Sequence, residues 1–268
     1  MSLRTLTVIA DDAGLDRHTD DAILAAARAG TVHGASVTAT GPTATSFVRR
    51  ARRAGLMVGL HVDLTEGCPL SGCLPGLTDA EGRWPGGKAA LAAAPAAAGD
   101  AIAVEVRRQW QHLVRAGATP AFVNGHNHVH VLPPVAHALS AVLARVAKQG
   151  VWVRVPRPVV DAPTDLADTL DAEHLEALER TLAPHEHPEA FVGLATMGDP
   201  CPEALGRELD AVPPTATWVE WMVHPGGRPG TRFTESPDRE REARWLVERK
   251  ALEALLAERG FVLGAGRP

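Results

Sequence analysis

The first sixty residues alternate between short apolar runs and amphipathic stretches, and this alternation limits the fold more than any other feature of the chain. Three runs have the length and continuous apolar character of buried strands: 6–10, 35–39 and 56–60. The two segments between them, 20–29 and 44–54, have the apolar spacing of helices, and a glycine closes each. Because parallel strands need a crossover connection, repeated strand–helix units predict a parallel sheet or barrel.

The same alternation continues towards the C-terminus. Further strands are expected at 121–123, 151–155, 191–194, 217–223 and 261–263. Further helices are expected at 101–116, 133–148, 173–182, 202–209 and, as one long charged helix, 237–259. We therefore predict an α/β protein, an irregular TIM-like (β/α) barrel of seven or eight mostly parallel strands. Residues 1–268 are expected to form a single domain, with a long loop insert at about 63–100 that serves as a lid or substrate wall.

Charge and cysteine usage narrow the class of protein. The formal net charge of −5 argues against a general nucleic-acid binder, which usually presents a basic face. The three cysteines are odd in number and form no Cys-x-x-Cys pair, which favours a reducing, cytoplasmic setting over a disulfide framework. No apolar stretch is long enough to span a bilayer, and the N-terminus does not have the pattern of a signal peptide. A small-molecule substrate is the expected partner, and a homodimer is possible.

Polar side chains suited to metal binding and acid–base chemistry follow four of the expected strands. They are Asp11, Asp12, His61, His126, His128, His130 and His224. The carboxyl ends of parallel strands meet at one mouth of a barrel, where such folds carry their chemistry, so we expect these groups to converge. In an extended segment alternate side chains share a face, and the three histidines of 126–130 are therefore expected to point the same way.

Two histidines and one carboxylate form the usual ligand set of a catalytic metal site. Asp11 and Asp12 suit a division of labour, in which one is a ligand and the other takes a proton from water as general base. A histidine opposite them could protonate the leaving group. Other roles stay open for each residue alone: the aspartates could cap a helix, and any one histidine could serve only to make hydrogen bonds.

Five segments together resemble the YdjC-like (ChbG/HpnK) carbohydrate deacetylases. They are Val8-Ile-Ala-Asp-Asp-Ala-Gly14, Gly41-Pro42, Val58-Gly-Leu-His-Val-Asp-Leu-Thr-Glu-Gly67, Gly125-His-Asn-His-Val-His130 and His224-Pro-Gly226. The resemblance implies a TIM-like barrel and a hydrolase acting on C–N bonds other than peptide bonds, which removes the acetyl group of an N-acetylated sugar such as a chitooligosaccharide. It makes Asp12, His61 and His126 the ligands of one divalent metal ion, Asp11 the general base and His224 the candidate general acid.

Three positions depart from the family pattern, which usually has Phe at Ala13, Asp at Asn124 and Asn at Asp63. Asn124 can still hydrogen-bond to a ligand histidine but carries no charge, and Asp63 adds negative charge near the mouth. Candidate substrate-binding residues are His128, His130, Arg154 and Asp63. Arg154 has a second possible role, which is to pair with a site aspartate.

The nature of the metal and the reaction leave alternatives. The resemblance points to Mg²⁺, whereas two histidine ligands chemically favour Zn²⁺ or another transition metal. Histidine clusters at strand ends also serve other metal-dependent amidohydrolases and phosphoesterases. A sugar-binding barrel without catalysis is the alternative outside enzymes.

Overall fold

The computed structural model describes residues 4–94, 98–147, 150–161, 170–197, 201–226 and 237–266. Within them, eight strands form one sheet in which every neighbouring pair is parallel. The strands are β1 (Arg4–Ala13), β2 (Gly34–Thr38), β3 (Met57–Val62), β4 (Phe122–Gly125), β5 (Trp152–Val153), β6 (Ala190–Val192), β7 (Trp218–Val223) and β8 (Phe261–Leu263). The predicted α/β class and irregular TIM-like barrel are confirmed.

The sheet is organised around β1, which has three partners. Its Thr5–Ala10 segment pairs with β7 along one edge. On the other edge its first residues pair with β8, and its later residues pair with β2. Strands β2, β3, β4 and β5 then follow in that order, and β6 lies beyond β7. A single bridge between Pro158 and Phe191 brings the two outer edges together, so the curved sheet closes only loosely.

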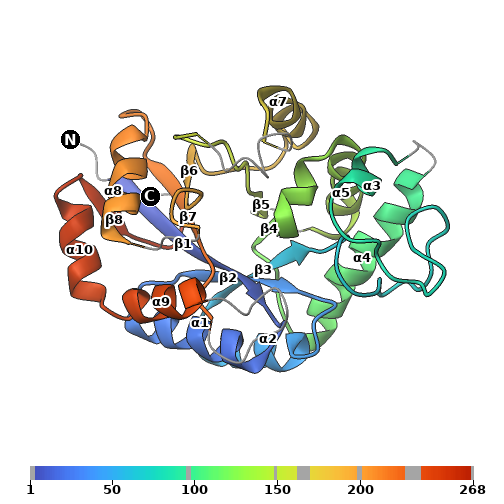
Figure 1. The fold of residues 1–268 in the computed structure, drawn as a ribbon, viewed down its shortest axis with the longest axis horizontal. Helices are drawn as coiled ribbons and strands as arrows, with labels where there is room; N and C mark the ends of the chain where they lie inside the picture. The colour runs from blue at the N-terminus through green and yellow to red at the C-terminus, as the bar shows by residue number, and fades with distance from the viewer. Residues whose placement is uncertain are drawn as a thin grey trace.

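Helices follow the strands and cover the outside of the curved sheet (Figure 1). They are α1 (Arg17–Ala29), α2 (Ala44–Arg53), α3 (Ala89–Ala92), α4 (Gly99–Ala116), α5 (Pro133–Val146), α7 (Ala172–Thr181), α8 (Pro202–Ala211), α9 (Pro237–Leu246) and α10 (Arg249–Ala257). The apolar faces predicted for them are buried: α1 packs Ile23 and Leu24 inward, and α5 packs Leu139 and Leu143. Most expected elements therefore lie within a few residues of their predicted bounds.

One long helix over 237–259 was a wrong prediction, because the segment forms two helices, α9 and α10. The buried positions explain the break. Leu246 is fully buried, and the next buried residues are Leu252 and Leu256. Six residues turn a straight helix by about 600°, which would place Leu246 and Leu252 about 120° apart around its axis, so the break lets each be fully buried.

The insert after β3 has no strand or helix between Asp63 and Lys88. Helix α4 holds it through two buried polar side chains. Gln109 bonds both backbone groups of Asp63, with its Oε1 accepting from N at 3.1 Å and its Nε2 donating to O at 2.6 Å. Glu105 accepts from the backbone N–H groups of Leu70 and Ser71 at 3.0 and 2.8 Å. The insert is thus attached to the barrel at Asp63 and again at Leu70 and Ser71.

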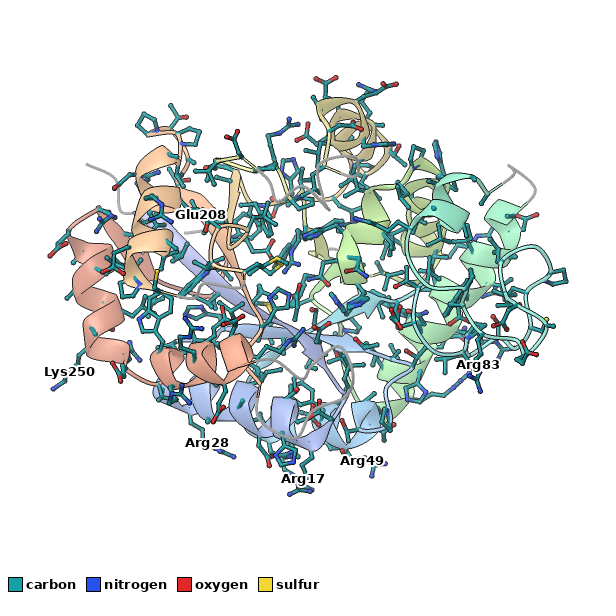
Figure 2. All side chains as sticks on the ribbon, viewed as in Figure 1. Arg17, Arg28, Arg49, Arg83, Glu208 and Lys250 are labelled. Atoms are coloured by element: carbon teal, nitrogen blue, oxygen red, sulfur yellow. The ribbon has the colours of Figure 1, made fainter. Side chains whose placement is uncertain are left out.

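Charged side chains divide clearly between surface and interior. Figure 2 shows Arg17, Arg28, Arg49 and Lys250 projecting away from the body. Glu208 is instead buried, and its carboxylate accepts from the N–H groups of residues 193–195 in the turn after β6. Among the described residues, no helix has the length and apolar character needed to cross a membrane.

Candidate metal centre and active site

The two adjacent aspartates lie in a bulge of β1. The pairing of β1 with β2 shifts register between Ala10 and Ala13, so the residues between them leave the regular ladder. Asp12 has φ of 65°, in the left-handed region that residues other than glycine seldom adopt. Such a conformation costs on the order of 1–3 kcal/mol and is found mainly where a side chain must be re-aimed for function. The bulge therefore sets the directions in which Asp11 and Asp12 point.

Asp12, His61 and His126 form a cluster that can hold a metal ion, with one ligand atom from each within 4.8 Å of the others. Oδ1 of Asp12 lies 3.2 Å from Nε2 of His61 and 3.2 Å from Nδ1 of His126. The three residues come from the ends of β1, β3 and β4, as the parallel sheet requires. One carboxylate oxygen and two imidazole nitrogens fit a divalent cation with further positions open to water or substrate.

Asn124 fixes the orientation of the His61 ring. Its Oδ1 lies 2.7 Å from Nδ1 of His61, and its Nδ2 donates to Oδ1 of Asp11 at 2.9 Å. Because the amide oxygen can only accept, Nδ1 of His61 carries the proton and Nε2 has its lone pair free to ligate. Ser36 lies beside both groups and donates to Oδ1 of Asp11 at 2.7 Å. The uncharged Asn124 thus links His61 to Asp11 without adding a third carboxylate.

The charges of the cluster are set by its neighbours. Burial favours the neutral form of Asp12, but Arg239, His126 and His61 outweigh it and hold the pKa of Asp12 well below its usual range. Burial disfavours the charged form of His126, but its hydrogen bond to Asp12 and the charge of that carboxylate raise the pKa of His126 to about 9. Asp12 is therefore ionised at neutral pH and available to a cation.

Asp11 is buried beside Arg154, which binds it with two N–H groups. Nη1 donates to Oδ2 at 2.5 Å and Nη2 donates to Oδ1 at 2.9 Å. Arg154 also donates to Oε1 of Glu220 from Nε at 2.7 Å. Burial acts to raise the pKa of Asp11, but the charge of Arg154 and its hydrogen bonds hold it below its usual range. Of the two roles predicted for Arg154, the structure supplies the ion pair with a site aspartate.

The histidine segment is not extended, so the expectation of three histidines on one face is wrong. Residues His126–Val131 form a 3₁₀ turn in which Asn127 and His128 have left-handed φ of 50° and 56°. The turn separates His126 from the other two histidines, whose ring centroids lie 6.2 Å apart. His126 faces Asp12, whereas Nε2 of His130 lies 3.1 Å from the carbonyl of Arg154. His128 is buried against the edge of the Phe191 ring.

Asp63 and His224 complete the set of predicted site residues. Asp63 is buried, and its Oδ1 accepts from the N–H groups of Thr65 and Glu66, so it closes the turn that begins the insert. His224 follows β7 and donates its backbone N–H to Glu242. Burial and the charge of Arg239 lower the pKa of His224 to about 4.

Comparison with known proteins places this arrangement in a family. The family model described as YdjC-like protein matches residues 5–257. The chain belongs to the YdjC-like family. A mouse protein named carbohydrate deacetylase is 32% identical over 249 residues, which cover 82% of this chain and 77% of the mouse protein. An Enterobacter protein named chitooligosaccharide deacetylase is 29% identical over 275 residues, which cover 98% of each of the two chains.

A solved structure supports the fold of this YdjC-like chain. An Enterococcus faecalis protein, whose name assigns it to cellobiose-phosphate cleavage, superposes with a TM-score of 0.78 at 20% identity. The match covers 98% of this chain and 97% of the other. At this level of identity the likeness shows a shared fold only.

Sequence reasoning missed three residues that build the YdjC-like site: Ser36, Glu220 and Arg239. Glu220 carried a usable signal, because a charged residue in the middle of the apolar strand Trp218–Val223 must be buried and paired. Ser36 lies in the short strand β2 and had no distinguishing pattern. Arg239 is one of several arginines in α9, and nothing in their spacing separates it from the surface ones.

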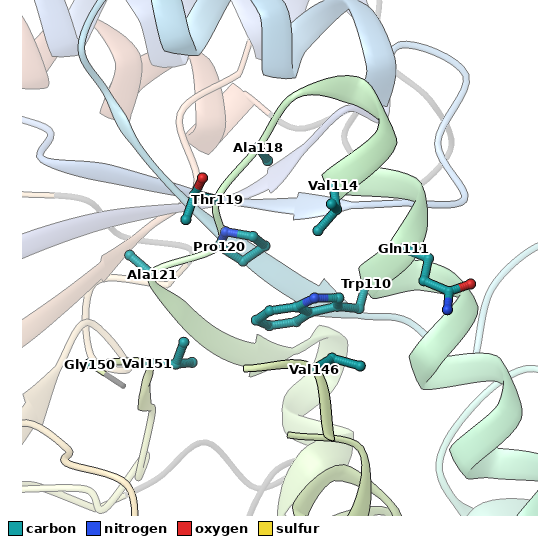
Figure 3. A pocket seen from close by; sticks show the side chains of 10 residues that line it. All are labelled: Trp110, Gln111, Val114, Ala118, Thr119, Pro120, Ala121, Val146, Gly150 and Val151. Carbon is teal, nitrogen blue, oxygen red and sulfur yellow. The ribbon is translucent and has the colours of Figure 1, made fainter. Parts of the chain in front are cut away.

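A separate apolar pocket of about 470 Å³ lies at the other end of the strands (Figure 3). Its lining includes 118–121, which leads into β4, and Gly150 and Val151, which precede β5. The metal cluster lies at the carboxyl ends of the strands, so the pocket is not part of it. Trp110 of α4 spans the pocket and is largely buried.

We expect Trp110→Ala to destabilise this YdjC-like protein without changing the Asp12–His61–His126 cluster. Truncating a buried tryptophan removes its packing and leaves a cavity, which costs about 3–5 kcal/mol. Urea unfolding measures that loss, and calorimetric titration with a divalent cation measures the metal affinity. A change in metal affinity comparable to that of a ligand variant would show that the two ends of the barrel are coupled.

Proposed function

We propose that this YdjC-like chain is a metal-dependent carbohydrate deacetylase, which hydrolyses the N-acetyl group of an N-acetylated sugar of the chitooligosaccharide class. The observation that carries the proposal is the Asp12–His61–His126 cluster together with a second ionised carboxylate, Asp11, which directly precedes Asp12 in the chain. The names of the mouse and Enterobacter relatives support the same activity. The geometry and the relatives thus lead to one class of reaction.

The residues proposed to hold the metal are Asp12, His61 and His126. A divalent cation there supplies Lewis-acid chemistry, activating water and polarising the acetyl carbonyl. Asn124 keeps Nε2 of His61 directed at the site by fixing its tautomer. Mg²⁺ follows from the family resemblance, whereas the two imidazole ligands suit Zn²⁺ as well.

Asp11 is the proposed general base. Its Oδ1 already accepts hydrogen bonds from Ser36, Asn124 and Arg154, whereas Oδ2 accepts one from Arg154. Oδ2 is therefore the atom with room to take a proton from the attacking water. Arg154 keeps Asp11 ionised and fixes the plane of its carboxylate, which is a positioning role. Direct substrate contacts of Arg154, Asp63, His128 and His130 stay predictions.

His224 is the proposed general acid that protonates the departing amine. Its pKa of about 4 means that the imidazole is neutral at pH 7. To act as an acid it must first receive a proton, and the proton that Asp11 removes from water is the available source. The charges of Asp12 and Asp11 both act to raise the pKa of His224, which supports such a transfer.

The test is acetate release from a panel of N-acetylated sugars by enzyme that has been stripped with a chelator. We expect no acetate from the stripped enzyme and recovery when Mg²⁺, Zn²⁺ or Mn²⁺ is returned, because the proposed chemistry needs the cation. Metal binding without acetate release would favour another amidohydrolase or a phosphoesterase. Sugar binding with neither metal uptake nor acetate would favour a barrel without catalysis.

A further inference from the structure

Arg239 of α9 contacts one carboxylate oxygen of Asp12, a proposed metal ligand. Its Nη2 donates to Oδ2 of Asp12 at 2.5 Å. The other oxygen of the same carboxylate, Oδ1, is the one that lies 3.2 Å from both ligand histidines. The two oxygens of Asp12 therefore have different neighbours: Oδ1 faces the two imidazoles and Oδ2 is taken by an arginine from a distant part of the chain.

Helix α9 is attached to the end of β7 by two further hydrogen bonds near this contact. The N–H of His224 donates to Oε2 of Glu242 at 2.6 Å, and the N–H of Gly226 donates to the carbonyl of Arg239 at 3.0 Å. The approach is close, since a Cβ on Gly226 would lie 3.0 Å from Cβ of Arg239. The first turn of α9 is thus held by the backbone at the mouth of the barrel, and Arg239 extends from it to Asp12.

Nη1 of Arg239 has no hydrogen-bond partner among the described residues, although it is buried. An arginine placed only to stabilise the fold would be expected to satisfy its buried donors. The one side-chain hydrogen bond of the guanidinium among the described residues is to Asp12. This observation favours a role directed at Asp12.

We propose that Arg239 is a positioning residue that presents Oδ1 of Asp12 as a single-oxygen metal ligand, and that it couples the docking of α9 to metal binding. The inference deepens the proposed function and rests on the Asp12 cluster holding a metal. With Oδ2 engaged, the carboxylate cannot swing to chelate with both oxygens, and its plane is fixed before the cation arrives. When a ligating carboxylate is held by such an outer hydrogen bond, removal of the partner lowers the metal affinity of the site.

Coupling between two sites is reciprocal. If the Arg239–Asp12 contact increases metal affinity, then the metal increases the stability of the docked α9 by the same factor. The backbone amides of α9 are therefore expected to exchange with solvent more slowly when the metal is bound. A role of Arg239 in packing alone predicts no such dependence on metal.

The experiment compares Arg239→Gln with Arg244→Gln in the full chain. Arg244 lies on the same helix, but its ion pair with Glu240 is largely exposed. Titration calorimetry with Mg²⁺ and with Zn²⁺ is expected to show a Kd about 10–100-fold weaker for Arg239→Gln, and no more than a small change for Arg244→Gln. Hydrogen exchange is expected to show metal protection of α9 in the wild type and in Arg244→Gln, and none in Arg239→Gln.

Arg239→Lys covers the case in which the glutamine variant does not fold, because it keeps the charge with one donor group. It is expected to bind metal with intermediate affinity. Unchanged metal affinity in a folded Arg239 variant would overturn the inference while leaving the proposed function intact. Tighter binding would also overturn it, since the arginine would then compete with the cation. A wild-type protein that binds no divalent cation would instead remove the proposed function on which the inference rests.

Discussion

Asp12→Asn is expected to remove metal binding and acetate release together. The cluster has only one carboxylate, and its Oδ1 is the oxygen nearest both ligand histidines. Loss of a partner that merely orients a ligand costs about 10–100-fold in metal affinity, so loss of the charged ligand should cost at least about 100-fold. Activity should fall by at least as much, because the proposed hydrolysis depends on the cation.

Asparagine is a better replacement than alanine at this position. Asp12 has φ of 65°, which asparagine tolerates and alanine does not, so Asp12→Asn should preserve the β1 bulge. Its amide oxygen can also continue to accept from Arg239. Circular dichroism and urea unfolding check that the variant is folded, and calorimetry with Mg²⁺ and Zn²⁺ gives the affinity.

Asp11→Asn is the matched comparison, one residue away. It should keep metal affinity close to that of the wild type and lose about 10²–10⁴-fold in the rate of acetate release, as expected for a general base. If Asp12→Asn released acetate at the normal rate, the metal assignment would be wrong. If Asp11→Asn did so, Asp11 would not be the base.

The local pattern of apolar and polar residues was sufficient to predict the barrel and the convergence of Asp11, Asp12, His61 and His126. Each of these residues follows or ends a strand, and parallel strands bring such ends together. The same pattern does not predict the direction of a side chain within a turn. Alternation suggested that His126, His128 and His130 share a face, but left-handed conformations at Asn127 and His128 turn His126 away from the other two. Nothing in residue type alone marks those conformations.

Contacts across the chain were the least predictable part of the site. Arg239 meets Asp12 over a separation of 227 residues, and Arg154 meets Asp11 over 143. The sequence showed arginines after a strand and along a helix, where a surface position is equally reasonable. Only packing decides which arginine turns inward, because a buried carboxylate must be compensated by whichever cation the fold brings near.

Arg154→Met is expected to cause a large loss of stability. Arg154 is fully buried between Asp11 and Glu220, both of which are also buried, and it contacts each within 2.7 Å. Removing it leaves two buried carboxylates uncompensated. Breaking a buried ion pair by removing one partner typically costs about 3–5 kcal/mol. Urea unfolding at pH 8 measures the loss in the free energy of unfolding.

The loss should depend on pH with a definite sign. Without Arg154 the folded-state pKa values of Asp11 and Glu220 rise, because burial then acts with little opposition. Even with Arg154 present, burial raises the pKa of Glu220 to about 7, above its ordinary value of 4.5. A raised carboxylate pKa gives stability that is present below the unfolded pKa and is lost as pH rises through the folded pKa. Arg154→Met should therefore be closer to wild type at pH 5 than at pH 8.

Glu220→Gln distinguishes the contribution of Glu220 to stability from that of Asp11. Alone, this substitution keeps the Arg154–Asp11 pair and should change stability much less than Arg154→Met. It should also remove the pH dependence of stability that Glu220 contributes between about pH 4.5 and 7. In the double variant Arg154→Met/Glu220→Gln only Asp11 is left uncompensated, so part of the stability should return. Equal losses for Arg154→Met with and without Glu220→Gln would mean that the cost lies in packing, or in Asp11 alone. The ion-pair account requires that the two substitutions be non-additive, because both act on the same buried charges.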